Sequence, residues 1–443
     1  MFSTASELLV VFTYAPAGLG HLRVVNTLSD VLADKDSAVL LGSNDKGIES
    51  IHKFISLNFI ARNLMEWFQR GEQQKIFTRL YRNYLKSGSK NLYQQVLEVF
   101  EQRVEVPKKI VFVCTHFGLA HQLANIKPKL EKTIGVKIYL VVQVTDDSPL
   151  YIWYVPGSDL TFVPSEKTKQ ELTEYGVKEK LPKIDFEVVP YPINPFLCED
   201  LSSEQYKLRV KQVERLSKEN IQVSVPISGA AVSMDFYRHL INRLNAKSQT
   251  FTFHVVSRLV TFTKYFINRA KEWPNVKVYT SSYDREVVDL YDELYKREII
   301  SLEITKPSEQ SFKALLSTQQ VGGSILLFSK PVGRQEYDNL DFMRRHNLIF
   351  SQEEQKYLWD KAQKSESISD LSIIKLFENK GKIRGLELPL GSIKAANFIW
   401  WCINHGIFEK MMEQGLYENK DFETGSNGVA IFWEKVKNLI KEE

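Results

Sequence analysis

The sequence predicts an α/β protein made of two Rossmann-like, doubly wound parallel-sheet domains. Short apolar runs rich in β-branched residues alternate with helical patterns through residues 1–200, and the same alternation restarts at residue 221. Such alternation is typical of parallel sheets whose crossover helices cover both faces. The chain has 443 residues, which is too long for one ordinary core and suits two domains of about 200 residues each.

Each apolar run is interpreted as one strand. In the N-terminal domain, residues 1–200, the predicted strands are Leu8–Phe12, Ala38–Leu41, Ile110–Val113, Val136–Val144, Leu160–Val163 and Phe186–Val189. Residues 201–220 are polar and are interpreted as the interdomain connection. In the second domain, residues 221–390, the predicted strands are Ile221–Val225, Phe251–Val256, Val276–Tyr279, Ile299–Ile304 and Ile325–Phe328. Residues 391–443 form a C-terminal helical segment, whose last helix, Val429–Ile440, is a candidate to return and brace the first domain.

The composition is that of a soluble globular protein, with 43% hydrophobic and 25% charged residues. A net charge of +4 is small for this length and does not argue for a nucleic-acid partner. The three cysteines, Cys114, Cys198 and Cys402, lie far apart without metal-ligand spacing, which indicates reduced, buried thiols. No signal peptide and no membrane span are recognisable, so we expect a cytoplasmic protein that needs no cofactor.

A glycine loop follows the first predicted strand. Gly18 and Gly20 precede His21, and apolar residues at helical spacing come next. The third glycine of a dinucleotide-binding loop is absent, so a dinucleotide site is rejected here. His21 stands at the helix start, where it is either a packing or capping residue or a general base beside a cleft.

A second polar loop follows the strand Ile325–Phe328. Lys330-Pro331-Val332-Gly333 predicts a tight turn, and a helix is predicted to start with Arg334, Gln335 and Glu336. Gln335 and Asn339 are four residues apart and share one helix face. Amide and carboxylate groups at the carboxyl edge of a parallel sheet suit a ribose or hexose, and the alternative is a solvated turn with a helix cap.

Two further elements are candidates for binding a diphosphate. The turn Ser228-Gly229-Ala230-Ala231 precedes a predicted helix, and Arg258 ends the strand Phe251–Val256. The alternative is an ordinary turn and a surface arginine. Asp146 and Asp147 are adjacent and make a poor metal pair, so we expect no metal, with Asp146 either orienting His21 or acting as the base itself.

Four stretches in order resemble the GT-B glycosyltransferases that move a sugar from a UDP-sugar to a lipid. The nearest families are monogalactosyldiacylglycerol synthase and the processive diacylglycerol glucosyltransferases, with the peptidoglycan N-acetylglucosaminyl transferase more distant. The matching stretches are Gly18–His21, Val144–Glu166, Pro190–Phe196, and Ile304–Pro307 followed by Pro331–Asn339. The resemblance implies two domains facing across a cleft and a donor site that includes Lys306, Arg334, Gln335, Glu336 and Asn339.

The chain also departs from that family. Ser308–Leu315 lacks the family's double glycine, and Lys313 or Ala314 stands where a glutamate binds the donor ribose. The family's histidine between the Thr-Asp pair and the tryptophan is missing. The implied function is transfer of a hexose from a UDP-linked donor to a lipid or other hydroxyl acceptor. The alternatives are a degenerate protein that binds a nucleotide or sugar without catalysis, and a nucleotide-sugar epimerase or hydrolase.

The segment from Ile51 to Val104 combines basic and aromatic residues in a helical pattern. It could lie on an anionic membrane surface as a peripheral contact. Alternatively, its aromatic side chains fill the core of a helix pair while the cations face water. The residues concerned are Trp67, Phe68, Arg70, Lys75, Phe77, Arg79, Tyr81, Arg82, Tyr84, Lys86 and Lys90.

Overall fold

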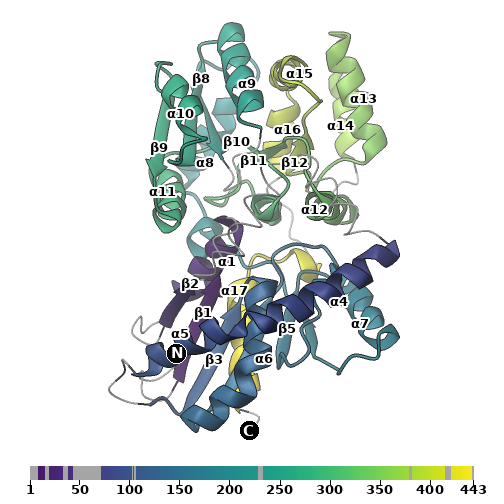
Figure 1. Ribbon diagram of the computed structural model, residues 1–443. Helices are drawn as coiled ribbons and strands as arrows, with labels where there is room; N and C mark the ends of the chain where they lie inside the picture. Colours follow the sequence, from purple (N-terminus) through teal and green to yellow (C-terminus); the bar gives the residue numbers. More distant parts are fainter. Residues whose placement is uncertain are drawn as a thin grey trace. The chain divides into compact units, whose positions relative to one another are not determined.

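The computed structural model describes residues 8–14, 19–32, 38–42, 71–101, 103, 106–227, 233–378, 382–414 and 421–441. The chain divides into two compact units: unit 1 is Met1–Pro192 with Asn427–Glu443, and unit 2 is Ile193–Ser426 (Figure 1). Each unit holds one six-stranded sheet in which every neighbouring pair of strands is parallel. The predicted fold class, two Rossmann-like α/β domains, is confirmed.

All the strands predicted for the first domain are present in unit 1. They are β1 (Leu8–Tyr14), β2 (Ala38–Gly42), β3 (Lys109–Cys114), β4 (Lys137–Gln143), β5 (Leu160–Val163) and β6 (Phe186–Val188). Their order in the sheet is β2-β1-β3-β4-β5-β6. The order reverses between β1 and β3, and ligands of open α/β sheets bind outside the carboxyl ends of strands at such a switch point.

Helices cover both faces of this sheet. They are α1 (Leu19–Ser29), α4 (Gly71–Ser87), α5 (Ser89–Glu101), α6 (Phe117–Ile134), α7 (Glu166–Lys178) and α17 (Gly428–Lys441), with a 3-10 turn η2 (Tyr151–Trp153). Leu9 and Val11 share a core with α5 and α6, whereas Phe12 on the opposite face packs edge-on against Trp433 of α17. Trp433 Nε1 also donates to Leu28 O at 3.1 Å. The expected return of the last helix to the first domain is therefore confirmed.

Unit 2 contains the five strands predicted for it and one more. They are β7 (Ile221–Pro226), β8 (Phe251–Arg258), β9 (Val276–Ser281), β10 (Leu302–Thr305), β11 (Ile325–Phe328) and β12 (Gly385–Glu387), in the order β12-β11-β10-β7-β8-β9. The switch point lies between β7 and β10. Strand β12 was not predicted, because it is three residues long and begins with a glycine. A Cβ at Gly385 would lie 2.6 Å from the Phe328 ring, so close packing explains the glycine.

The helices of unit 2 surround this sheet. They are α8 (Ser203–Val213), α9 (Met234–Lys247), α10 (Lys264–Ala270), α11 (Asp284–Arg297), α12 (Arg334–Arg345), α13 (Gln352–Gln363), α14 (Asp370–Phe377), α15 (Ser392–Asn404) and α16 (Ile407–Glu413). The 3-10 turns are η3 (Pro195–Cys198), η4 (Glu309–Leu315) and η6 (Phe422–Thr424). Helix α8 forms within the polar stretch expected to connect the domains. The apolar stretch 395–407 is divided at Gly406, whose φ of 69° ends α15 and starts α16. Within the described ranges, no helix is long and apolar enough to cross a bilayer.

The two faces of the unit 2 sheet differ in polarity. One face packs apolar strand residues against α9, α10 and the C-terminal helices. The other carries a row of buried polar side chains, because Glu303 of β10 neighbours Ser224 of β7, which neighbours His254 of β8. His254 Nε2 lies 2.7 Å from Gln222 Oε1, and its Nδ1 lies 3.2 Å from the Tyr279 hydroxyl. A neutral imidazole donates from one ring nitrogen and accepts at the other, and these two partners of His254 suit that form.

The buried His254 makes the stability of the protein depend on pH. Burial lowers its pKa to about 4, from an ordinary value of 6.5. Between these values the unfolded chain binds the proton and the folded chain does not, so stability falls as the pH falls from about 6.5 to about 4. On going from about pH 7 to pH 4.5, this residue should remove on the order of 2–3 kcal/mol from the free energy of unfolding. Chemical unfolding at both pH values should show that His254→Gln loses less of its free energy of unfolding than the wild type does. An equal loss in the two proteins would contradict the assignment of this pH dependence to His254.

Candidate functional site

At the carboxyl edge of the unit 1 sheet, residues that follow β3 and β4 contact His21, which itself follows β1. Gly20 and His21 lie in the first turn of α1, while Gly18 falls outside the described residues. The half-buried His21 has its Nδ1 3.4 Å from Thr145 Oγ1, which follows β4. Its ring also stands edge-on to His116 with centroids 5.3 Å apart. The carbonyl oxygen of His21 accepts a hydrogen bond from Thr115 Oγ1 at 3.1 Å.

Three residues of this site, Thr115, His116 and Thr145, were not predicted as site residues from the sequence. All three follow the predicted strands Ile110–Val113 and Val136–Val144 within three residues. Polar residues directly after a strand of a parallel sheet lie at its carboxyl edge, so this position was a usable signal. The order of the strands in the sheet was not predicted from the sequence, and this order decides which strand ends are neighbours.

The two adjacent aspartates have different surroundings. Asp147 is fully buried and accepts hydrogen bonds from Ser165 Oγ and from Thr168 Oγ1, the latter at 2.8 Å. Ser165 caps α7 by accepting from the backbone N–H of Thr168, so Asp147 stabilises the start of that helix. Asp146 is half-buried beside it. The role predicted for Asp146, orienting His21 or acting as the base, stays a prediction.

At the carboxyl edge of the unit 2 sheet, the structure brings together three of the predicted donor residues. Lys306 directly follows β10, and its Nζ lies 3.6 Å from Glu336 Oε2. The backbone N–H of Val332 donates to the same carboxylate. Asn339, one turn further along α12, is fully buried and donates from Nδ2 to Pro307 O at 3.1 Å. The turn after β10 and helix α12 are thus held side by side at the switch point.

The carboxyl group of Glu336 is largely desolvated. Burial raises its pKa, the cation of Lys306 works in the opposite direction, and the charge of Glu309 adds to the rise. A carboxylate that has lost most of its water is a strong acceptor for hydroxyl donors. Among the described residues, no three His, Cys, Asp or Glu side chains are grouped as a metal site would need.

Two of the other predicted donor residues, Arg334 and Gln335, lie on the first turn of α12 beside Glu336. Helix α12 begins at Arg334 after Gly333, which has a φ of 102°, as the predicted turn and helix require. Arg334 pairs within its own helix with Asp338 at 3.2 Å, and Gln335 is half-buried. Arg258 lies at the end of β8, two strands from β10, and pairs with Asp284 at 3.0 Å. The turn 228–231, with Gly229 and Ala230, lies outside the described residues.

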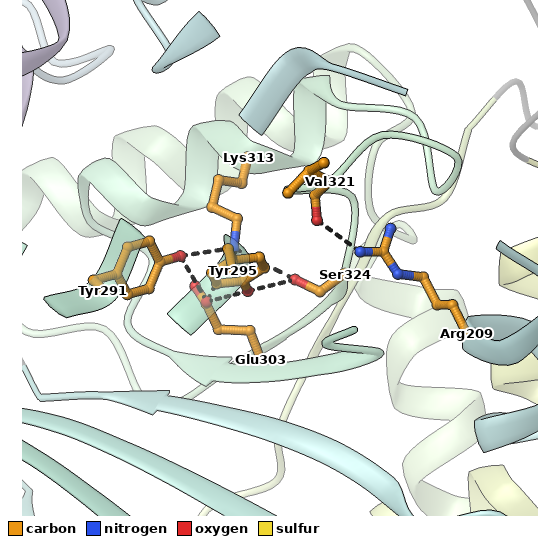
Figure 2. A network of polar contacts seen from close by, with 7 residues as sticks. All are labelled: Arg209, Tyr291, Tyr295, Glu303, Lys313, Val321 and Ser324. Carbon is orange, nitrogen blue, oxygen red and sulfur yellow. Dashed lines mark hydrogen bonds and ion pairs between the residues drawn. The ribbon is translucent and has the colours of Figure 1, made fainter. Parts of the chain in front are cut away.

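Lys313 points into the interior of unit 2. Its Nζ lies 3.0 Å from Glu303 Oε2 and donates to the hydroxyls of Tyr291 and Tyr295 at 2.7 and 2.6 Å (Figure 2). Both tyrosines in turn donate to Glu303, and Tyr295 also contacts Ser324 at 3.0 Å. The side chains of Lys313 and Glu303 are 4% and 0% exposed, so this is a core ion pair. The position at which the resembling family carries a ribose-binding glutamate is a core position here.

The loop that follows η4 is held by two buried arginines. Arg209 of α8 donates to the carbonyl oxygens of Thr318, Gln320 and Val321 at 2.6–2.8 Å, the last of which Figure 2 shows. Arg384 donates to three further carbonyls, at residues 316, 411 and 414. Burial lowers the pKa of both arginines to about 10. The loop that follows η4 is therefore tightly packed.

The basic and aromatic segment is described from residue 71 onward, so Trp67, Phe68 and Arg70 lie outside the described residues. Its helix α4 carries stacked aromatic rings. The ring centroids of Phe77 and Tyr81 are 5.5 Å apart, and those of Tyr81 and Tyr84 are 6.1 Å apart. Phe77 and Tyr81 are half-buried, whereas Tyr84 is exposed. The rings therefore only partly fill the core.

No family model and no curated protein matches the chain. Solved structures of low similarity cover nearly all of it. A UDP-GlcNAc 2-epimerase from Neisseria meningitidis bound to UDP-GlcNAc is 12% identical, with 98% of this chain and 100% of that chain covered and a TM-score of 0.46. MurG of Acinetobacter baumannii is 8% identical, with 97% and 99% covered and a TM-score of 0.43. A glycosyltransferase from Rickettsia africae is 11% identical, with 99% and 100% covered and a TM-score of 0.43. Similarity at this level carries no argument about activity.

The core ion pair should behave as one unit in a double-mutant cycle. Lys313→Met should lower the free energy of unfolding by about 3–5 kcal/mol, because it leaves the charge of Glu303 buried without its cation. Adding Glu303→Gln should recover part of that loss, since the pair is then removed together. Chemical unfolding of both variants measures the difference, with Lys356→Met on the exposed face of α13 as the control. A double variant less stable than Lys313→Met would contradict the pairing.

Proposed function

We propose that this protein transfers a hexose from a UDP-linked sugar to a hydroxyl group of a lipid or other acceptor, without a metal. The observation that carries the proposal is the group Lys306, Glu336 and Asn339 at the switch point of the unit 2 sheet. A desolvated carboxylate beside a buried amide offers acceptors and donors for a ring with many hydroxyls. The four ordered motifs that resemble GT-B glycosyltransferases support the same assignment.

Unit 2 would bind the donor. Glu336 and Gln335 lie on the first turn of α12 and would contact the sugar hydroxyls. The buried Asn339 would hold the turn after β10 beside them through its hydrogen bond to Pro307 O. The departing diphosphate needs positive charge and backbone N–H groups. Arg258 at the end of β8 and the turn that includes Gly229 and Ala230 are the groups proposed for this role. Arg334 and Lys306 add positive charge near the start of α12.

Unit 1 would activate the acceptor. His21 at the carboxyl edge of the first sheet would remove the proton from the acceptor hydroxyl as that oxygen attacks the anomeric carbon. The bond from the anomeric carbon to the diphosphate oxygen breaks, and the electron pair leaves with the UDP. Asp146 would assist by orienting the base, or would itself take the proton.

One observation favours a second candidate function, that of a degenerate protein which binds a nucleotide or a sugar without catalysis. Lys313 or Ala314 stands where the resembling family has its ribose-binding glutamate, and Lys313 is engaged in the core with Glu303. A donor would therefore have to be held without that carboxylate. The epimerase or hydrolase alternative is separated by its substrate requirement, because it turns over the donor without any acceptor.

Binding of the donor should stabilise the protein in a ligand-specific manner. A UDP-sugar at about 100 times its dissociation constant should add roughly 2.7 kcal/mol, seen as a rise in melting temperature. The variant Gln335→Ala with Glu336→Ala should lose this rise. A matched control is Gln352→Ala with Glu353→Ala, the same residue pair at the exposed start of α13. No rise with any nucleotide-sugar would overturn donor binding, and turnover without an acceptor would favour the epimerase or hydrolase.

Helix α4 supports the proposal that the acceptor is a lipid at an anionic membrane surface. Its outward face carries large apolar side chains, with Ile76 and Leu80 each 65% exposed and Tyr84 49% exposed. These residues recur every four positions and form one stripe. Arg79 lies beside the stripe with its side chain 74% exposed, and its Nη2 lies 3.1 Å from Glu179 Oε2. An exposed apolar stripe on a helix that also carries a basic side chain matches the requirements of an anionic bilayer surface.

The opposite face of α4 is polar and buried, which is the reverse of an ordinary surface helix. Gln74, Thr78 and Arg82 point inward. Arg82 Nη2 donates to the carbonyl oxygens of Tyr151 and Tyr154, each at 2.8 Å. These hydrogen bonds fix the rotation of the helix about its axis, so the apolar stripe has to face outward.

The protein should therefore bind vesicles that contain phosphatidylglycerol and sediment with them. Ile76→Ser with Leu80→Ser should weaken binding at least tenfold, because burial of each such side chain contributes about 1.5–3 kcal/mol. The control is Leu371→Ser with Ile374→Ser on α14, whose side chains are 63% and 52% exposed. Equal loss in both variants, or no sedimentation with anionic vesicles, would contradict the membrane contact.

A further inference from the structure

We infer that His346 is a proton-dependent clamp: its charged ring joins the end of α12 to η6, and loss of the ring proton opens this contact. His346 is the residue at which α12 ends. Its partners are Asp421, which caps η6, and Glu423, which lies within η6. None of the three belongs to the candidate donor group, and the inference does not depend on the proposed function.

Each ring nitrogen of His346 lies within hydrogen-bonding distance of a carboxylate. Nδ1 is 2.6 Å from Asp421 Oδ2, and Nε2 is 3.0 Å from Glu423 Oε2. A neutral imidazole has one N–H, so it can donate to only one of these oxygens, and its bare nitrogen then faces the other carboxylate. The imidazolium has two N–H groups and can donate to both. The arrangement therefore favours the charged ring.

The end of α12 also favours a positive charge at this position. Asn347 follows His346 with a φ of 53°, in the left-handed region. Its backbone N–H donates to Arg344 O at 3.1 Å, and that of Leu348 donates to Met343 O at 2.8 Å. These two hydrogen bonds close the helix end. The ring of His346 thus lies beside the negative end of the helix dipole, where a cation is stabilised.

Two arginines precede the clamp on α12, and both have partners of their own. Arg344 forms ion pairs with Asp341, at 2.9 Å, and with Glu387 of β12. The guanidinium carbon of Arg345 lies 5.7 Å from the centroid of the Phe342 ring. The same ring packs against the imidazole, with centroids 4.4 Å apart. The charge of Arg344 is thus countered by carboxylates from its own helix and from β12, while the carboxylates of η6 act directly on the imidazole.

The clamp makes the contact depend on pH. Burial disfavours the charged ring, but the hydrogen bonds and charges of Glu423 and Asp421 outweigh burial and raise the pKa of His346 above its ordinary value of 6.5. The folded chain therefore holds the proton at pH values at which the unfolded chain has lost it. The stabilisation is complete below about pH 6.5 and is lost as the pH rises through the raised pKa. This direction is opposite to that of the buried His254.

The turn held by the clamp is the last one before the chain leaves unit 2. Asp421 Oδ1 accepts a hydrogen bond from the backbone N–H of Glu423 at 3.1 Å, so the carboxylate that binds His346 also caps η6. Asp421 O accepts from the backbone N–H of Thr424, also at 3.1 Å. The chain passes from unit 2 to unit 1 between residues 426 and 427. Opening of the clamp would release η6 from the end of α12 at this point of the chain.

The titration of the His346 ring is the first test. In protein labelled with 15N-histidine, the ring signals of His346 are those that disappear in His346→Gln. Their midpoint should lie above 6.5 in the wild type, and it should fall in Glu423→Gln, which removes the charge of one acceptor. His239→Gln, on the exposed face of α9, is the control and should leave the midpoint unchanged. A wild-type midpoint at or below 6.5 would overturn the inference.

The opening of η6 is the second test. Amide hydrogen exchange of residues 423–425, corrected for the intrinsic effect of pH on exchange, reports this opening. Below the midpoint, these amides should exchange about tenfold faster in His346→Gln than in the wild type, as expected for the loss of a hydrogen bond to a charged group. Well above the midpoint, the two proteins should exchange equally, because the wild-type ring has lost its proton.

Two results of the exchange experiment would contradict the clamp. Equal exchange below the midpoint would show that His346 does not hold η6. A difference that persists unchanged well above the midpoint would show that the ring holds η6 without its proton. If His346→Gln does not fold, Glu423→Gln takes its place in the comparison, because it removes one of the two ionic contacts of the same ring.

Discussion

Parallel pairing of strands is the constraint on which the rest of the structure depends. Every strand of a parallel sheet runs in the same direction, so the chain has to return through a crossover, and all carboxyl ends meet at one edge. Where the strand order reverses, the loops on either side diverge and leave room for a ligand. In unit 1 this point lies between β1 and β3, next to His21, and in unit 2 it lies between β7 and β10, next to Lys306.

Unit 2 contains several charged side chains that are buried. Burying a charge costs free energy unless the charge has polar or oppositely charged partners, and the buried charges of unit 2 have such partners. Lys313 is matched by Glu303 and two tyrosines, and the guanidinium groups of Arg209 and Arg384 are matched by backbone carbonyls. Together these contacts fix η4 and the loop after it against the sheet, directly beyond the turn that carries Lys306. A segment without the family's double glycine thereby obtains a defined conformation.

The two candidate sites differ in how far the sequence could predict them. Glu336 and Asn339 were predictable because both lie on one continuous motif, and helical spacing places them on the same side of α12. The partners of His21 were not predictable, because Thr115 and Thr145 are 94 and 124 residues away from it in the chain. The family resemblance marked the position of Lys313 as altered, but it could not show that this side chain turns into the core.

The sequence by itself determined the elements: eleven apolar runs became strands close to their predicted bounds, because a buried parallel strand needs a nearly continuous apolar segment. It also determined the class of fold and the return of the last helix. Only the tertiary structure decided which strand ends are neighbours, that Gly385–Glu387 adds a sixth strand, and that α4 turns its polar face inward. These features depend on contacts between distant segments, such as Arg82 with Tyr151, and local patterns do not encode such pairings.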